Sequence, residues 1–172
     1  MRNIILYISI LTPLLALSQK SFSEKNPHVY EYRDYIENLS DTTLVTLNNE
    51  EFVKDNYDGG SQLTGTYYNN ELVKISSWFG LSNGINTCDY YLKDGELFFV
   101  VEKLKIFKYD SETDQYDYTS YDGYADGWYL FDSGHLVDQI SLGHWRFEDD
   151  TLDPEVILIS EFKEYSKLLN KN

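Results

Sequence analysis

Residues 67–101 read YYNNELVKISSWFGLSNGINTCDYYLKDGELFFVV, and this stretch decides the fold. Twice within it, an aromatic segment leads into a two-residue turn, and an apolar segment with Leu at its second position leads out. The turns are Asn-Asn at 69–70 and Asp-Gly at 94–95, and a third copy has Ser-Gly at 133–134. These dipeptides tolerate the positive φ angles that two-residue hairpin turns require. The sequence therefore predicts three β-hairpins of one antiparallel sheet.

Counting outward from each turn predicts which residues face each other across a hairpin. Side chains alternate between the two faces of a strand, so the first and second pairs from a turn lie on opposite faces. The second pairs are apolar and should share one face: Tyr67–Leu72, Leu92–Leu97 and Phe131–Leu136. The first pairs are mostly polar, and we expect them to face water: Tyr68–Glu71, Lys93–Glu96 and Asp132–His135.

Apolar and β-branched runs extend the hairpins into a meander. Residues 98–101 are Phe-Phe-Val-Val, apolar on both faces, so we expect their strand to be central, with a helix or second layer over its other side. The expected strands are 42–47, 62–68, 71–79, 87–92, 96–109, 127–131 and 135–142. Residues 80–84 are expected to form a loop, 110–125 a Tyr- and Asp-rich excursion, and 143–147 an additional edge strand.

Two segments carry the spacing of amphipathic helices. Residues 28–39 place apolar side chains three and four apart after Asn26-Pro27, which suits a helix start. A second helix is expected to follow the acids and proline at 153–155, with a short strand at 156–159 as the alternative. Residues 19–27 are expected to be a flexible lead-in. The predicted fold class is α+β, an antiparallel meander of about six to eight strands with an N-terminal and a C-terminal helix.

Residues 1–18 have the features of a secretory signal peptide. Arg2 precedes a nearly continuous apolar run over 4–17, and Ala16 and Ser18 put small residues where a signal peptidase cleaves. The run is too short and too poorly flanked for a stable membrane span, and an uncleaved anchor is the alternative. We therefore expect a single β-rich domain over 19–172, secreted or periplasmic, with no membrane span after cleavage.

The chain is strongly acidic, with 14 basic and 29 acidic residues and a net charge of −15. Removal of residues 1–18 takes away Arg2 and no acid, so 13 basic and 29 acidic residues remain, a balance of −16. Phosphate backbones and anionic lipids repel such a chain, so nucleic-acid binding is disfavoured. The single cysteine, Cys88, is expected to be a buried free thiol that packs as a small apolar group.

The excursion at 110–125 contains one candidate metal site. Asp110, Glu112 and Asp114 have the alternate spacing of the first ligands of a calcium loop. The rest of that pattern is missing, because Gln115 stands where the loop needs Gly and Tyr121 where it needs a bidentate Glu. We therefore expect a solvated hairpin tip, with weak calcium binding as the alternative, and we expect no cofactor.

The chain holds more aromatic side chains than one core needs. There are 16 Tyr and 3 Trp, and several gather in and just after the excursion. Exposed Tyr and Trp on a rigid sheet suit sugar stacking or protein contact, whereas β-sheets also favour aromatic residues for packing alone. The residues we select as a candidate binding surface are Tyr116, Tyr118, Tyr121, Tyr124 and Trp128.

No catalytic pattern stands out. The three histidines His28, His135 and His144 lack metal-ligand spacing, and no G-x-S-x-G nucleophile elbow occurs. We expect a non-catalytic, exported binding module of the cell envelope with a protein or glycan partner. The alternatives are an extracellular hydrolase, which needs His135 or His144 beside a carboxylate and a Ser or Cys, and an acidic inhibitor or immunity-type protein for a basic partner.

The run 58–65, with 72–75, 79–84 and the later Tyr90-Tyr91, is similar to a group of uncharacterised secreted proteins of gram-negative bacteria. The aromatic-turn-Leu units also resemble MORN-type repeats, although the period is irregular and the Gly before each unit remains only at Gly65 and Gly127. The resemblance to the secreted proteins covers about residues 57–142. It implies export and a β-meander, and it implies no activity.

Overall fold

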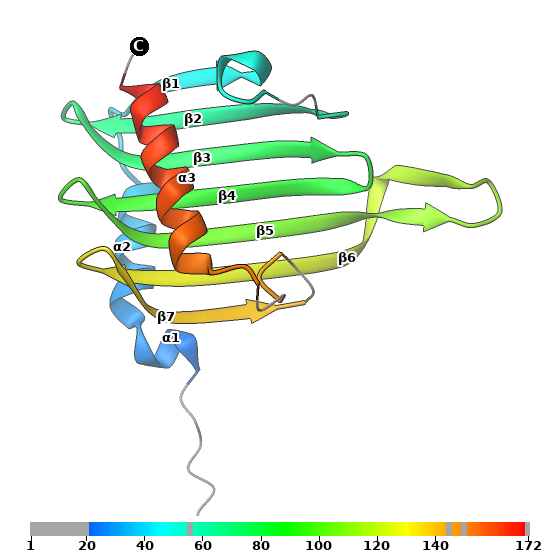
Figure 1. The fold of residues 1–172 in the computed structure, drawn as a ribbon. Helices are drawn as coiled ribbons and strands as arrows, with labels where there is room; N and C mark the ends of the chain where they lie inside the picture. The colour runs from blue at the N-terminus through cyan, green and yellow to red at the C-terminus, as the bar shows by residue number, and fades with distance from the viewer. Residues whose placement is uncertain (1–20, 55–56, 144–145, 149–150, 171–172) are drawn as a thin grey trace, which may run out of the picture.

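A computed structural model of the protein describes residues 21–54, 57–143, 146–148 and 151–170, so the predicted signal peptide lies outside the described residues. One antiparallel sheet holds seven strands in the order β1 to β7, a simple meander with helices on both faces (Figure 1). The predicted α+β class is confirmed. The strands are β1 Thr43–Asn48, β2 Gly60–Tyr68, β3 Glu71–Leu81, β4 Gly84–Lys93, β5 Glu96–Asp110, β6 Gln115–Asp132 and β7 His135–Leu142. The helices are α1 Phe22–Lys25, α2 Pro27–Glu37 and α3 Pro154–Leu169, with a 3-10 turn, η1, at Asn49–Glu51.

The three predicted hairpin turns are confirmed with their chemistry. Both central residues of each turn have positive φ, for example 54° at Asp94 and 80° at Gly95. Such pairs of left-handed residues give the turn whose twist matches that of the flanking strands. The six predicted cross-strand pairs also occur in the register. Leu72, Leu97 and Leu136 join one apolar cluster, so the predicted common face exists.

Three local predictions are wrong or need refinement, and at 156–159 the expected C-terminal helix is confirmed over the alternative strand. Residues 19–27 include α1, because the Ser21 side chain caps the Glu24 N–H and the Glu24 carboxylate accepts the Ser21 N–H. Residues 80–84 are not a loop: strand β3 extends to Leu81, β4 begins at Gly84, and only residues 82–83 form the turn between them. The described residues of 143–147 are bend and turn, not an edge strand. Residues 156–159 are helical, because the Asp153 side chain caps α3 at its first turn.

The sheet separates two apolar layers. On one face, Tyr90 and Val100 lie under Leu158 and Leu169 of α3, and all four are at most 1% exposed. On the other face, Phe99 packs with Val29 and Ile36 of α2 and with Phe22 of α1. Strand β5 contributes to both layers through adjacent residues, as its doubly apolar sequence predicts.

The two helical layers differ in how much sheet they cover. Helix α3 crosses the front of the sheet in Figure 1, whereas α1 and α2 lie behind the strand ends near the hairpin turns at 69–70, 94–95 and 133–134. The cluster that contains α2 reaches Val101 on β5 and Trp128 on β6. Beyond these two residues, no helix among the described residues covers this face.

Strands β5 and β6 continue past their neighbours as a two-stranded arm (Figure 1). Register shifts at 106–107 and 107–108 mark where the arm leaves the sheet. On β6, three extra residues separate Asp117 from Tyr121, and such a bulge increases the local twist and re-aims side chains. The arm is the predicted excursion at 110–125, ordered as paired strands.

Replacement of Phe99 by Ala tests the doubly covered strand. Phe99 is fully buried between β4, β6 and α2, so Phe99→Ala should lower the free energy of unfolding by about 3–5 kcal/mol. The matched control is Val137→Ala on edge strand β7, where the side chain is 55% exposed and the change should stay within about 0.5 kcal/mol. Urea titration followed by circular dichroism measures both. Equal losses in the two variants would contradict the second layer.

Candidate binding surface

The part of the α2-side face that α2 does not cover presents a regular array of side chains. The register aligns Gln62, Trp78, Thr87, Lys103 and Asp126 in one row across strands β2 to β6. Lys103 and Asp126 lie two residues from Val101 and Trp128, which pack in the α2 layer, and side chains two residues apart point to the same face. The other three residues are aligned with Lys103 across the strands, so all five lie on this face. A second row, at 85, 105 and 124, continues toward the arm. We call these two rows the open face.

The open face combines exposed rings with polar groups. Tyr124 is 63% exposed, Lys103 and Lys105 are exposed, and Trp78 is half-buried between its neighbours. Adjacent strands lie about 4.8 Å apart, so the row from Trp78 to Asp126 spans about 14 Å. The rigid sheet fixes these side chains at defined spacings, which is the geometry of a flat recognition platform.

The aromatic side chains of the arm continue from the open face. The Tyr121 ring lies 5.5 Å from Phe107 and 6.2 Å from Tyr124, and the Lys105 ammonium sits 5.5 Å above it. Tyr118 packs edge-on against Phe107 and remains 65% exposed. Tyr121 therefore connects the rings of the arm to those of the sheet, and the exposed ring of Tyr118 lies farther along the arm.

The five residues selected from the sequence divide into two groups. Tyr118 and Tyr124 are exposed, and Tyr116 and Tyr121 are partly buried in ring contacts of the arm. Trp128 lies apart from them, because it packs against Tyr30 at 5.0 Å and against Phe22 and Phe99, under α1 and α2. Trp78, Lys103 and Lys105 were not selected. Their alternation along strands shows a common face, but only the position of α2 shows which half of that face is open.

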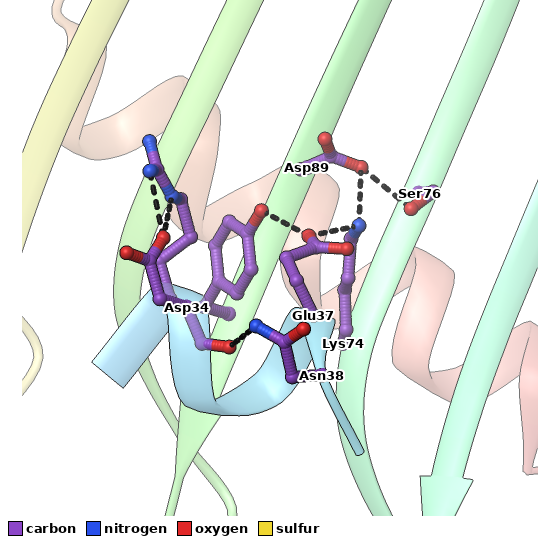
Figure 2. A network of polar contacts seen from close by, with 8 residues as sticks. Asp34, Glu37, Asn38, Lys74, Ser76 and Asp89 are labelled. Carbon is purple, nitrogen blue, oxygen red and sulfur yellow. Dashed lines mark hydrogen bonds and ion pairs between the residues drawn. The ribbon is translucent and has the colours of Figure 1, made fainter. Parts of the chain in front are cut away.

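A polar network marks the boundary between α2 and the open face (Figure 2). Lys74 of β3 binds Glu37 of α2 at 2.6 Å and Asp89 of β4 at 3.4 Å. The Tyr91 hydroxyl also donates to Glu37 at 2.6 Å, and the Ser76 hydroxyl donates to Asp89 at 2.5 Å. Burial alone would raise the pKa of Glu37, but the hydrogen bonds from Lys74 and Tyr91 lower it below its usual value of 4.5. The network ties the last turn of α2 to the sheet.

A second polar network lies inside the α3 layer. Glu102 of β5 is 1% exposed, and its carboxylate forms an ion pair with the Arg146 guanidinium at 3.0 Å. The same guanidinium makes two hydrogen bonds to Glu161 of α3, at 2.6 and 3.0 Å, and the Tyr90 hydroxyl donates to Glu161 at 2.6 Å. Burial alone would lower the pKa of Arg146, but these two carboxylates raise it above its usual value. The network joins strand, loop and helix, and its one sequence signal is an acid placed directly after an apolar run.

Cys88 is a buried free thiol, as predicted. Burial raises the pKa of the thiol, and the nearby Glu102 charge raises it further. A thiol with a raised pKa stays protonated at neutral pH and is a poor nucleophile.

An open groove of about 720 Å³ lies between α3 and the tips of the β2–β3 and β4–β5 hairpins. Leu72, Leu92 and Phe162 form its apolar part. Its rim carries the carboxylates Glu71 and Asp94 together with the cation Lys163.

The structure does not support the calcium prediction. Among the described residues, no three His, Cys, Asp or Glu side chains gather where a metal ion would bind, and this includes Asp110, Glu112 and Asp114. Asp110 accepts the Glu112 N–H at 2.9 Å, and Asp114 accepts the Tyr109 hydroxyl. Hydrogen bonds from Ser120 and Thr119 lower the pKa of Asp117 to about 2. These carboxylates shape the turns of the arm.

The structure places one histidine beside a carboxylate. His135 Nδ1 lies 3.3 Å from Glu155 Oε1, and its side chain is 77% exposed. No hydrogen bond joins His135 to a Ser or Cys side chain within the described residues, and His144 and Trp145 lie outside them. Among the described residues, the arrangement that would favour a hydrolase therefore has the His–carboxylate pair and lacks a Ser or Cys bonded to the histidine.

Comparisons with protein-family models, curated proteins and solved structures find no match to this chain. The resemblance to secreted proteins with MORN-like units stays a prediction. No helix within the described ranges has the length and apolar character needed to cross a membrane.

Removal of Arg146 tests the buried ion network. Arg146→Met removes the guanidinium that pairs with the buried Glu102 carboxylate, and the free energy of unfolding should fall by about 3–5 kcal/mol. The double variant Arg146→Met/Glu102→Gln also removes the buried negative charge and should recover part of that loss. Chemical denaturation of the wild type and both variants gives the comparison. A double variant no more stable than Arg146→Met would show that charge burial is not the cause.

The boundary network predicts a pH dependence. Because the pKa of Glu37 is lower in the folded chain than its usual 4.5, its stabilising contribution is complete above about pH 4.5 and is lost as the pH falls through the folded value. Lys74→Met removes the cation that interacts with Glu37. The stability advantage of the wild type over Lys74→Met should be constant from about pH 7 to 5 and shrink below that range, as measured by thermal unfolding. An advantage that grows on acidification would contradict this network.

Proposed function

We propose that this protein is an exported, non-catalytic binding module of the bacterial cell envelope, and that it binds through the open face together with the tyrosines of the arm. One observation carries the proposal. Tyr118 and Tyr124 are 65% and 63% exposed; Tyr124 lies on the paired backbone of β6, and Tyr118, in the bulge, is held by its ring contact with Phe107. Tyrosine supplies contact area at a low entropy cost, and its hydroxyl offers a hydrogen bond.

The surroundings of these rings support recognition rather than chemistry. The open groove of about 720 Å³ lies beside α3 at the hairpin tips, and none of the ring or lysine side chains of the open face lines it. The buried carboxylate of Glu102 and its partner Arg146 lie on the opposite side of the sheet, in the α3 layer. The open face and the arm present aromatic rings, hydroxyls, lysines and the Asp126 carboxylate, and these groups bind ligands through stacking and hydrogen bonds.

The experiment measures retention of the mature chain, residues 19–172, on insoluble envelope fractions of gram-negative bacteria. The variant Tyr118→Ala/Tyr124→Ala loses two exposed ring contacts, and its affinity should fall about tenfold or more. The control is Tyr35→Ala, which removes a tyrosine 54% exposed on α2, away from the open face. Circular dichroism should show that all three proteins are folded. Equal retention of the wild type and the double variant would contradict the proposal.

A further inference from the structure

We infer that the open face binds an uncharged glycan chain laid across strands β3 to β6. This inference rests on the proposed function and names the chemical class of its ligand. The rings, the hydrogen-bonding groups and the charge of the face each limit what can bind, and together they favour a neutral polyol.

The rings are placed to stack on more than one sugar unit. Trp78 on β3 and Tyr124 on β6 lie at opposite ends of the array, three strands apart, or about 14 Å. Tyr121 is fixed beside Tyr124 by its stack on Phe107. An aromatic face presents a flat apolar surface, and the C–H side of a sugar ring is complementary to it. Rings at this separation suit a chain rather than a single sugar.

The polar groups between the rings suit hydroxyl ligands. Thr87 carries a donor and an acceptor, Lys103 is a donor, and Asp126 is an acceptor. Lys103 and Asp126 are direct cross-strand neighbours in the register, and Thr87 is the neighbour of Lys103 on its other side. A sugar hydroxyl both donates and accepts, so a row that alternates the two functions can bind several hydroxyls at once.

The charge of the face argues against a polyanion. Lys103 and Lys105 of the open face belong to a chain of net charge −15, and the cross-strand neighbour of Lys103 is an acid. Long-range repulsion opposes the approach of anionic polymers to such a chain. A neutral ligand experiences no repulsion and still uses the lysines as hydrogen-bond donors.

The composition of the face also argues against a protein partner. Protein interface cores are depleted in Lys, Asp and Ser relative to the rest of the surface. On this face, Lys103 and Lys105 lie within the array on β5, between the rings of Trp78 and Tyr124, and Asp126 lies beside Lys103 on β6. The backing of the sheet by the α3 core holds the array in place, so little entropy is lost when a ligand binds.

The experiment titrates the mature chain with the hexasaccharides of β-1,4-glucose, β-1,4-N-acetylglucosamine and α-1,4-glucose, and follows tryptophan fluorescence and heat. At least one should bind, with an affinity that changes little between roughly 0.05 and 0.5 M NaCl because no ligand charge is screened. Trp78→Ala should weaken that binding about fivefold to tenfold. Trp78→Phe should keep most of the affinity and remove most of the fluorescence change.

Thr87→Val keeps the shape of the side chain and removes its hydroxyl, so it tests the face with little risk to folding. It should weaken binding about threefold to tenfold. The control is Thr43→Val, an exposed threonine of β1 opposite Tyr67 and on the α3 side of the sheet, where no change is expected.

Two results would overturn the inference. Alginate or polyglutamate bound in place of the neutral hexasaccharides, with strong salt dependence, would show a site for polyanions. No binding of any saccharide, while Tyr118→Ala/Tyr124→Ala still lowers envelope retention, would refute the glycan and leave the proposed function standing. A third result, no saccharide binding together with equal envelope retention of the wild type and Tyr118→Ala/Tyr124→Ala, would refute both the glycan inference and the proposed function.

Discussion

Strand β5 must be covered on both faces, and the architecture follows from that constraint. Phe99 and Val101 point to one side and Val100 to the other, and all three are at most 4% exposed. Helix α3 crosses several strands on one side of the sheet, whereas the eleven residues of α2 lie on the other side, behind the strand ends near the hairpin turns (Figure 1). The sheet is longer than α2 can cover. The remaining part of the face is polar in sequence, and this is the part to which we assign binding.

Two polar networks hold these layers in place. Arg146 connects the buried Glu102 of β5 to Glu161 of α3, so the loop before α3 is tied to both helix and strand. Lys74 connects Glu37 of α2 to Asp89 on the sheet (Figure 2). The first network stiffens the sheet from behind the open face. The second sets where α2 ends and the open face begins, so the extent of the surface depends on one lysine between two carboxylates.

Local sequence signals predicted the sheet well, because turn chemistry and strand alternation act over few residues. The turn at 94–95 and its Leu92–Leu97 pair needed only Asp-Gly and period two. Long-range contacts were out of reach of such signals. Trp128 and Tyr124 lie on one face of one strand, and their different exposure depends on where α1 and α2 dock. Phe22 of α1 packs in this layer, and the local signal for α1 is the capping box between Ser21 and Glu24. The partner of Glu102 likewise comes from a loop 44 residues away.

The most direct test of the partly covered face is hydroxyl-radical footprinting of the free, mature protein, with each residue's oxidation rate normalised to that in the unfolded chain. Tyr124 and Trp128 are four residues apart on the same face of β6, so they differ chiefly in whether a helix covers them. We expect strong protection of Trp128 and little protection of Tyr124. Equal protection of the two side chains would show that the face is either fully covered or fully open, and would contradict the binding surface derived from it.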